Sequence, residues 1–390
     1  MRQKGVLWLT LFLCLIFLGG CWDNKDLERR VLVLGAAVDL AAEGGRAAEP
    51  WKITLEMPIL RRMVARGGGG GGGGDGGQGD DTMPTWRLTL TGATFAEAIN
   101  KGATRSERTL FFGHQKIIVL GEELARRDAL QSVLDWWTRN RESYVAINVL
   151  LAEGDAAAIM EGRPEFARSV SMFLNDEMQQ VIKTTRFVKH SLQEVLVALD
   201  AGDDILLARV KVLPDGKPQV AGTGVIHRGR LVGWLSPEET QAALWITGET
   251  KGCDVLVVPV PELDNVFSLE FCKIKPKIKP KMENESLSFE VKIEFNGRIA
   301  EKMGNPGILK AGDLQLVEGK AEAVITERLQ QVMSKLQRQY RADVLGFGRR
   351  IEKKWPHQWE GMKEQWPQIF AGIPVTLQVK VKILGTGLVS

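Results

Sequence analysis

Apolar residues follow two spacings along the first half of the chain, and these predict strands and helices. Residues 31–38 form a continuous apolar run and residues 51–57 alternate apolar with polar, so both are predicted strands. Thr94 and Glu97 have the spacing of a capping box, which starts a helix. Helices and strands continue to alternate up to residue 200. This succession predicts an N-terminal α/β domain over residues 21–200.

The next stretch is dominated by short strands. Residues 210–213, 219–227 and 231–235 are apolar-rich and are separated by glycine-containing turns, a pattern typical of a β-meander. One helix, beginning after Ser236, interrupts the strands. We therefore expect a middle, mostly-β domain over residues 205–285.

The last domain is predicted over residues 286–390, with alternating strands at 288–295 and 373–383. A long helix is expected over 321–345, with one apolar stripe made of Ile325, Leu329, Val332, Leu336, Tyr340 and Val344. A second helical stripe follows, made of Trp355, Trp359, Met362, Trp366 and Phe370. Tryptophans can form an interfacial belt at a membrane, but we interpret these as packed on a sheet. The fold class is mixed α/β, with several sheets and packed helices.

A glycine tract lies between the predicted strands of the first domain, at residues 67–80. A phosphate-binding loop would require a lysine and a serine or threonine at its end, followed by a helix. Neither is present, so we interpret the tract as a flexible loop.

The amino terminus has the pattern of a secretory leader, with a charged start and an apolar run from Val6 to Leu18 that is too short to span a bilayer. Leu18-Gly-Gly-Cys21 resembles the lipobox of bacterial lipoproteins. We expect residues 1–20 to be removed and Cys21 to carry a diacylglycerol and an N-acyl chain such as palmitate. Multiple acyl chains anchor a protein stably to a membrane.

Composition narrows the remaining possibilities. Residues 1–20 hold two of the 51 basic and none of the 48 acidic residues, leaving a net charge of about +1. This argues against a nucleic-acid partner, which requires a strongly basic surface. Once Cys14 leaves with the leader and Cys21 is lipidated, Cys253 and Cys272 remain. They either form a disulfide, which an extracytoplasmic location permits, or stay buried thiols, the interpretation we favour.

One basic run, Lys273–Lys281, alternates lysine with isoleucine or proline. It could face anionic lipid headgroups near the tether. It could also be a strand that lysine and proline protect from edge pairing, and we favour this second interpretation.

Catalytic and metal motifs are absent from the sequence. The four histidines do not have zinc-ligand spacing, and no nucleophile motif occurs. The sequence leaves open an enzyme with a scattered site, such as one formed by His114, Asp135 and Arg139. We expect His114 to be a loop residue that bonds backbone, and the protein not to be an enzyme, with no cofactor beyond the covalent lipid and no bound metal.

Several segments together resemble the C-subunit family of bacterial spore germinant receptors, the Ger(x)C lipoproteins. The opening Cys21-Trp-Asp with the strand ending at Asp39 is similar to that family's start. The most specific set consists of Asp343-Val-Leu-Gly-Phe-Gly348, Trp355-Pro356, Trp359 and Trp366. Further matches are Thr94 with Glu97-Ala98, Phe112-Gly-His114, Gly121-Glu122 with Leu124-Ala125, Gly222-Thr-Gly-Val225 and Leu231-Val-Gly233. The glycine tract and Asp26-Leu27 depart from the family pattern.

The resemblance implies a non-enzymatic subunit on the outer face of the spore inner membrane. In that family it works with polytopic A and B subunits, and we do not expect this subunit to bind the nutrient itself. A substrate-binding lipoprotein of a transporter is the main alternative, since it shares the lipobox. That class usually has two similar α/β lobes, which the predicted elements do not match.

Overall fold

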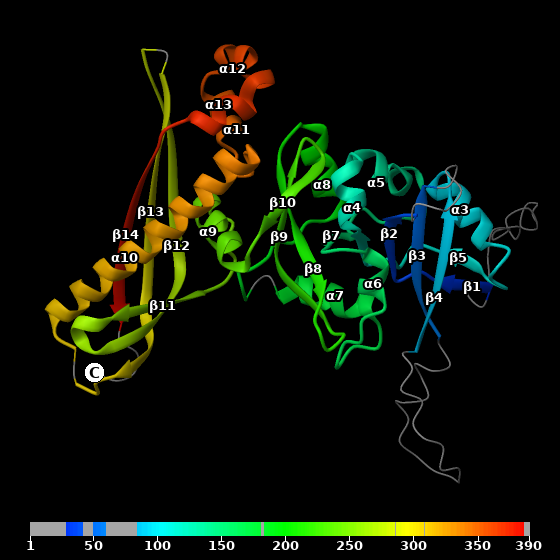
Figure 1. Ribbon diagram of the computed structural model, residues 1–390, viewed down its shortest axis with the longest axis horizontal. Coiled ribbons are helices and arrows are strands. Elements are labelled where there is room, and N and C mark those ends of the chain that lie inside the picture. The colour runs from blue at the N-terminus through cyan, green and yellow to red at the C-terminus, as the bar shows by residue number, and fades with distance from the viewer. Residues whose placement is uncertain are drawn as a thin grey trace, which may run out of the picture.

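A computed structural model describes residues 29–41, 50–59, 84–180, 183–284, 286–307 and 309–385. The predicted leader, the lipidation site Cys21 and the glycine tract at 67–80 lie outside these residues. Two sheets, set side by side along the long axis, organise the described chain (Figure 1). We call residues 29–235 the N-terminal part and residues 236–385 the C-terminal part.

The N-terminal part is built on a sheet in the order β10-β9-β8-β7-β6-β2-β3-β4. Its strands are β2 (Gly35–Leu40), β3 (Trp51–Pro58), β4 (Thr85–Gly92), β6 (Ile117–Leu120), β7 (Asn148–Ala152), β8 (Ile205–Val212), β9 (Pro218–His227) and β10 (Arg230–Leu235). The central pairs, from β2 through β8, are parallel and the outer ones antiparallel. A short parallel pair, β1 (Arg30–Leu32) with β5 (Thr109–Phe111), lies beside it.

Helices cover both faces of this sheet, as its buried central strands require. One face packs on α3 (Phe95–Gly102), α4 (Glu122–Arg127), α5 (Leu130–Arg139) and α8 (Leu192–Asp200). The other packs on α6 (Ala156–Met160) and α7 (Val170–Gln179). As the sequence predicts, Thr94 caps α3 through a 3.1 Å bond from the backbone N–H of Glu97.

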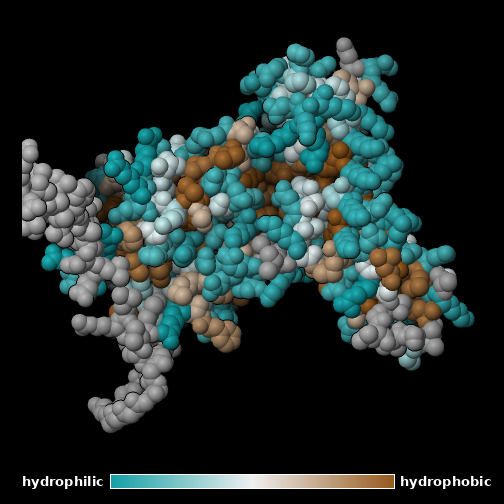
Figure 2. All heavy atoms as spheres, turned by 180° about the vertical axis from the view of Figure 1, so that it is seen from behind, coloured by the Kyte–Doolittle hydropathy of each residue, from teal (hydrophilic) through white to brown (hydrophobic). Residues whose placement is uncertain are grey.

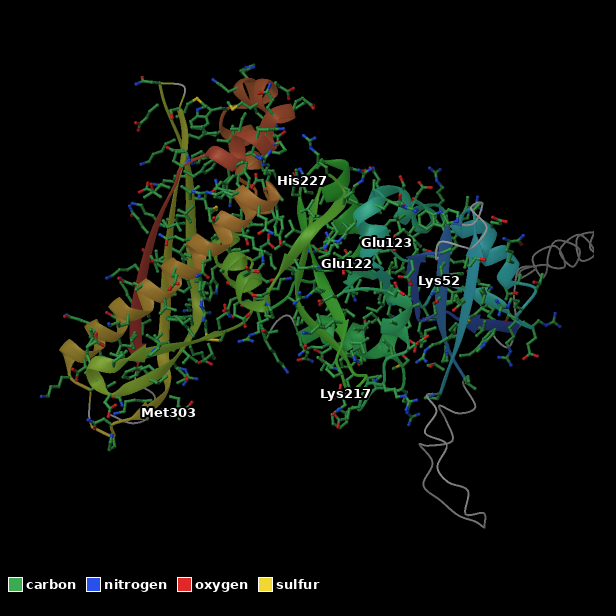
Figure 3. The ribbon with its side chains drawn as sticks, viewed as in Figure 1. Lys52, Glu122, Glu123, Lys217, His227 and Met303 are labelled. Carbon is green, nitrogen blue, oxygen red and sulfur yellow. A yellow bond between two sulfur atoms is a disulfide. The ribbon has the colours of Figure 1, made fainter. Side chains whose placement is uncertain are left out.

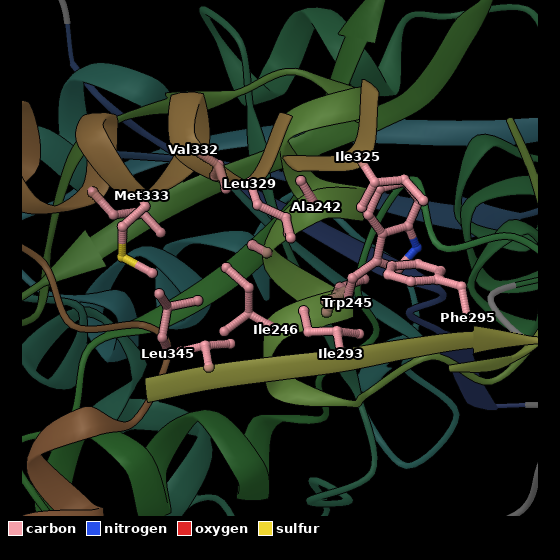
Figure 4. Packing of buried hydrophobic residues seen from close by; sticks show 14 of the residues in the cluster. Ala242, Trp245, Ile246, Ile293, Phe295, Ile325, Leu329, Val332, Met333 and Leu345 are labelled. Atoms are coloured by element: carbon pink, nitrogen blue, oxygen red, sulfur yellow. The ribbon is translucent and has the colours of Figure 1, made fainter. Parts of the chain in front are cut away.

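The C-terminal part has a sheet in the order β11-β12-β13-β14. Its strands are β11 (Asp254–Val260), β12 (Asn265–Glu283), β13 (Ser286–Gly304) and β14 (Val375–Gly385). One face packs on α9 (Pro237–Thr247) and α10 (Ala311–Ser334), and a short 3-10 helix, η3 (Pro261–Leu263), joins the first two strands. Figure 4 shows Trp245 and Ile246 of α9 enclosed between Ile325 and Leu329 of α10 and Phe295 of β13.

After α10 the chain continues as a π-helix, η4 (Lys335–Tyr340), and then as three short helices. These are α11 (Phe347–Lys354), α12 (Pro356–Met362) and α13 (Trp366–Gly372), with a 3-10 turn, η5 (Lys363–Gln365), between the last two. Trp366 and Phe370 are buried in the C-terminal core, while Trp355 and Trp359 are half-buried against it. The core interpretation of the tryptophan stripe is confirmed. None of the described helices combines the length and apolar character needed to cross a bilayer.

The fold confirms the mixed α/β class, but three details differ from expectation. The predicted middle domain over 205–285 is not a separate sheet, because β8 to β10 extend the N-terminal sheet whereas β11 and β12 belong to the C-terminal one. The long helix begins at Ala311, ten residues before the predicted start, since only its later turns carry the full apolar stripe. Cys253 and Cys272 form a disulfide and are exposed. The prediction of two buried thiols is therefore wrong.

Candidate functional site at the junction of the two parts

Asp204 connects the two parts through its carboxylate. It lies directly before β8, is 8% exposed, and accepts hydrogen bonds from three groups. His227 Nδ1 donates at 2.9 Å, the backbone N–H of Arg228 at 3.2 Å and the backbone N–H of Asp343 at 2.7 Å. The first donor is the last residue of β9, the second begins the turn after it, and the third belongs to the C-terminal part. Bonds to a charged, buried acceptor are stronger than neutral ones, so this carboxylate fixes the turn and the junction together.

Asp343 continues this network into the helices that follow. Its carboxylate accepts hydrogen bonds from the backbone N–H groups of Phe347 at 2.9 Å and Gly348 at 2.6 Å. Both groups lie in the first turn of α11, where a backbone N–H has no acceptor within the helix. The indole Nε1 of Trp366 donates to the same carboxylate at 2.9 Å. Burial raises the pKa of Asp343 to about 6, and the nearby negative charge of Asp204 adds to the increase.

Two glycines in the same segment allow the close packing. Gly346 has a φ of 68°, in the left-handed region, and lets the chain turn into α11. A Cβ on Gly348 would lie 2.7 Å from Cη2 of Trp359 and 2.9 Å from Nε1 of Trp366. The family-like segment Asp343–Gly348 thus has a physical role, because it seats both tryptophans against the junction.

Further contacts and two cavities surround this centre. Arg349 pairs with Asp203, and Arg228 Nη2 donates to the backbone oxygen of Glu364 at 3.3 Å. Cavities of about 550 Å³ and about 540 Å³ are both lined by Asp204 and Asp343. Figure 3 shows His227 at the end of the N-terminal part nearest α11 to α13. The junction is polar and charged, and its bonds run between the two parts.

A second contact region lies along η4. The Tyr340 hydroxyl donates to the backbone oxygen of Trp234 at 3.0 Å, and a side chain on Gly233 would collide with the Tyr340 ring. Lys335 pairs with Glu239 at 2.7 Å. A cleft of about 450 Å³ nearby is lined by Trp234, Glu239 and Lys335 together with Arg209. On the face shown in Figure 2, hydrophilic residues cover most of the surface, and apolar residues gather in a band near the middle.

Buried acids in the N-terminal part have helix-capping partners. Asp39 accepts from the backbone N–H groups of Ala156 and Ala157 at 2.7 and 2.8 Å, and burial raises its pKa. Glu56 accepts from the backbone N–H of Ser171 at 2.8 Å and from its hydroxyl at 2.6 Å. These carboxylates hold helix N-termini, and their oxygens are engaged in structural bonds.

The residues of the enzyme hypothesis do not form a common site. His114 is exposed in a turn, with its ring against Phe111 at 5.9 Å. Asp135 pairs with Arg139 at 2.7 Å along the exposed surface of α5. The expected backbone bond of His114 remains a prediction. Asp204 and His227 were not identified from sequence, because an isolated aspartate and histidine carry no spacing signal; Asp343 was noticed only as part of a family motif.

A cluster of potential metal ligands in the described chain consists of Cys253, Glu270 and Cys272. The two sulfurs are joined in a disulfide and so are not thiolate ligands. We therefore do not assign a metal site to this cluster.

Comparisons with known proteins agree along the whole chain. The family model described as "Spore germination protein N-terminal domain" matches residues 23–212, and "Spore germination B3/ GerAC like, C-terminal" matches residues 221–387. Spore germination protein YndF of Bacillus subtilis (strain 168) is 27% identical, covering 100% of this chain and 98% of that protein.

Other similar proteins are consistent with these matches. Spore germination protein B3 of the same organism is 26% identical over 97% of each chain. Spore germination protein KC is 24% identical, covering 100% of this chain and 97% of that protein. The crystal structure of the GerBC protein shares the fold, with a TM-score of 0.59 and 23% identity over 89% of this chain and 97% of that one. The chain belongs to the Ger(x)C family of spore germination proteins.

Proposed function

We propose that this chain is the lipid-anchored C subunit of a spore nutrient-germinant receptor. The observation that carries the proposal is the match of both spore germination family models, which begins at residue 23, two residues after Cys21 of the lipobox-like Leu18–Cys21. Cys21 would carry diacylglycerol and an N-acyl chain and hold the protein on the outer face of the spore inner membrane. The body would assemble with the polytopic A and B subunits and catalyse no reaction.

The junction suggests what the body contributes. A surface that contacts two partners can relay movement between them only if its own parts keep a fixed relation. The hydrogen bond from the Asp343 N–H to Asp204 is partly buried and crosses from one part to the other, and the bonds of the Asp343 carboxylate continue it into α11. We infer that they keep the two parts in one orientation, so that the subunit stabilises or couples its partners.

The transporter alternative receives less support. Substrate-binding lipoproteins usually have two similar lobes around a cleft, whereas the two sheets here differ in strand number, order and direction. A melting temperature that rises with a nutrient in the isolated subunit would favour the alternative.

The anchor is tested by replacing Cys21 with alanine in a sporulating strain. We expect Cys21→Ala to release the protein from spore membranes into the soluble fraction. Cys14→Ala is the matched control, because it removes a thiol from the leader without touching the lipidation site, and it should remain bound. Persistent membrane attachment of Cys21→Ala would remove the lipid anchor from the proposal.

Assembly is tested by isolating the tagged protein from detergent-solubilised spore membranes and identifying its companions. Two polytopic proteins in fixed ratio would support the receptor subunit. Recovery with transport proteins, or with no companion, would contradict it.

A further inference from the structure

The outer face of the C-terminal sheet, opposite α9 and α10, carries a dense group of lysines. Apolar side chains of β12 to β14 point to the core, and the alternate positions point outward. We call these outward, exposed residues the lysine face: Lys273, Lys275, Lys277, Lys279, Lys281, Lys292, Lys380 and Lys382. The strand register joins them, since Lys277 lies opposite Lys292 and Asn296 lies opposite both Lys273 and Lys382.

Few acids balance this charge. Glu290 and Glu294 are the acids of β13 among these rows, and Glu290 already contacts Lys281 at 3.5 Å and Lys292 at 3.0 Å. Lys380 lies on the edge strand β14 and reaches round that edge to Glu322 of α10 at 3.2 Å, so its charge is already paired. Within the described chain, no ion pair involves the remaining β12 lysines, which are Lys273, Lys275, Lys277 and Lys279. Glu294 lies opposite Lys275 and Glu290 opposite Lys279, which offsets part of the charge. The lysines still outnumber these two acids, and like charges on adjacent positions repel one another, so the face gains from an anionic counterpart.

Edge protection accounts for only part of the pattern. β11 pairs with β12 only as far as Phe271, so the lysine-rich half of β12 is an edge strand, as the favoured interpretation expects. Edge lysines do discourage pairing with other chains. Lys292 lies on β13, which is paired on both sides by β12 and β14, so it protects no edge. The charge therefore extends across the face, beyond what an edge requires.

The residue types favour a lipid surface over a protein partner. Protein interfaces are enriched in arginine and aromatic residues and depleted in lysine. Lysine dominates this face, and Arg298, the arginine of β13 on the same face, is already paired with Glu270 at 2.7 Å. Lysine is a flexible point charge whose stem can lie along an apolar boundary. Three exposed valines adjoin it on the same outer face: Val255 at 49%, Val257 at 53% and Val266 at 39% exposure. Cations beside exposed apolar side chains are typical of surfaces that bind the membrane interface.

We propose that the lysine face binds the anionic headgroups of the bilayer to which the protein is tethered. The biological context rests on the proposed lipid anchor, but the binding itself does not require it. A lysine near an anionic surface contributes about fivefold to membrane affinity. Removing the four unpaired β12 lysines should therefore weaken binding by roughly 600-fold if their contributions multiply.

The test uses the unlipidated mature chain, residues 21–390 with Cys21→Ala, so that binding is measured without the anchor. It is mixed with vesicles of equal parts phosphatidylcholine and phosphatidylglycerol, or of phosphatidylcholine alone, and sedimented. The variant is K273Q/K275Q/K277Q/K279Q. The matched control, K116Q/K183Q/K251Q/K353Q, removes four exposed lysines from other surfaces and changes the net charge equally.

We expect binding to the anionic vesicles only, lost in the variant, kept in the control and weakened by salt. If the variant and the matched control lost vesicle binding to the same extent, the proposal would be overturned, because net charge and not the lysine face would then determine binding. Failure of the parent chain to bind would also overturn it without affecting the lipid anchor, which Cys21→Ala tests separately. If the variant kept vesicle binding but lost a companion protein from spore membranes, the face would belong to an acidic protein partner.

Discussion

The backbone N–H of Asp343 donates a 2.7 Å hydrogen bond to the carboxylate of Asp204, joining positions 139 residues apart. Asp343 in turn holds the start of α11 and the indole of Trp366. Two carboxylates in series thus connect the turn after β9 to the last three helices. The bonds of Asp343 are partly buried, so a donor that loses its acceptor here has restricted access to water.

Asp204→Ala should destabilise the fold by about 2–4 kcal/mol, since it leaves the N–H groups of Arg228 and Asp343 without their acceptor. Urea unfolding followed by tryptophan fluorescence measures the loss. Asp176→Ala is the control, because Asp176 is exposed on α7, and it should change stability by less than about 0.5 kcal/mol. Equal stability of the two variants would contradict the role of Asp204.

The raised pKa of Asp343 predicts a pH dependence. The carboxyl has a pKa of about 6 in the fold against 3.8 ordinarily, so the folded state holds its proton more tightly than the unfolded chain does. The free energy of unfolding should therefore fall as pH rises from about 4 to about 6 through this group. Two pKa units correspond to about 3 kcal/mol, and above about pH 6 no further loss is expected from it.

Asp343→Asn isolates this contribution, because asparagine does not titrate and other groups are common to both proteins. The variant should be less stable than the parent. Asparagine has only one side-chain oxygen, so its NH₂ group, which cannot accept a hydrogen bond, would face either the Phe347 N–H or the N–H groups of Gly348 and Trp366. The difference should be largest near pH 4 and shrink towards pH 7. Unfolding free energies measured across this range would refute the assignment if the two pH profiles ran parallel.

Gly348→Ala tests the packing of the two tryptophans. The added Cβ would approach Trp359 and Trp366 within 2.9 Å, so the rings must move and the indole bond to Asp343 weakens. We expect a loss of about 1–3 kcal/mol in unfolding free energy. Gly361→Ala in α12 meets no atom within 4 Å and should be neutral or stabilise by up to about 1 kcal/mol. A neutral Gly348→Ala variant would show that the fit is loose.

Local periodicity predicts the helices and strands of this chain, because the burial of each helix or strand face is encoded by residues that are close in sequence. The stripe through Ile325, Leu329 and Val332 is buried as its spacing requires. Periodicity does not predict which strand pairs with which. β8 and β11 are both apolar-rich strands, but they join different sheets. The pattern encodes burial of one face and carries no information on which sheet supplies the neighbour.

The hydrogen bonds of the junction could not be predicted either, because they join residues that are distant in sequence. Asp204 follows a glycine and an aspartate in what reads as an ordinary polar turn, and its partner lies far along the chain. Family resemblance pointed to Asp343 and Gly348 without saying what they contact. The tertiary structure supplies that contact, because hydrogen bonds between distant residues leave no periodic trace in sequence.

The disulfide between Cys253 and Cys272 gives the last prediction. It closes a loop with a sequence separation of 19 across the turn between β11 and β12, and a bridge of this length contributes about 3 kcal/mol by restricting the unfolded chain. In the mature chain with Cys21→Ala these are the remaining cysteines. Alkylation of the denatured protein should therefore label no thiol before reduction and two after it. Reduction should lower the melting temperature of this protein but leave the C253S/C272S variant unchanged. Two labelled thiols in protein taken from spore membranes without reductant would contradict the bridge.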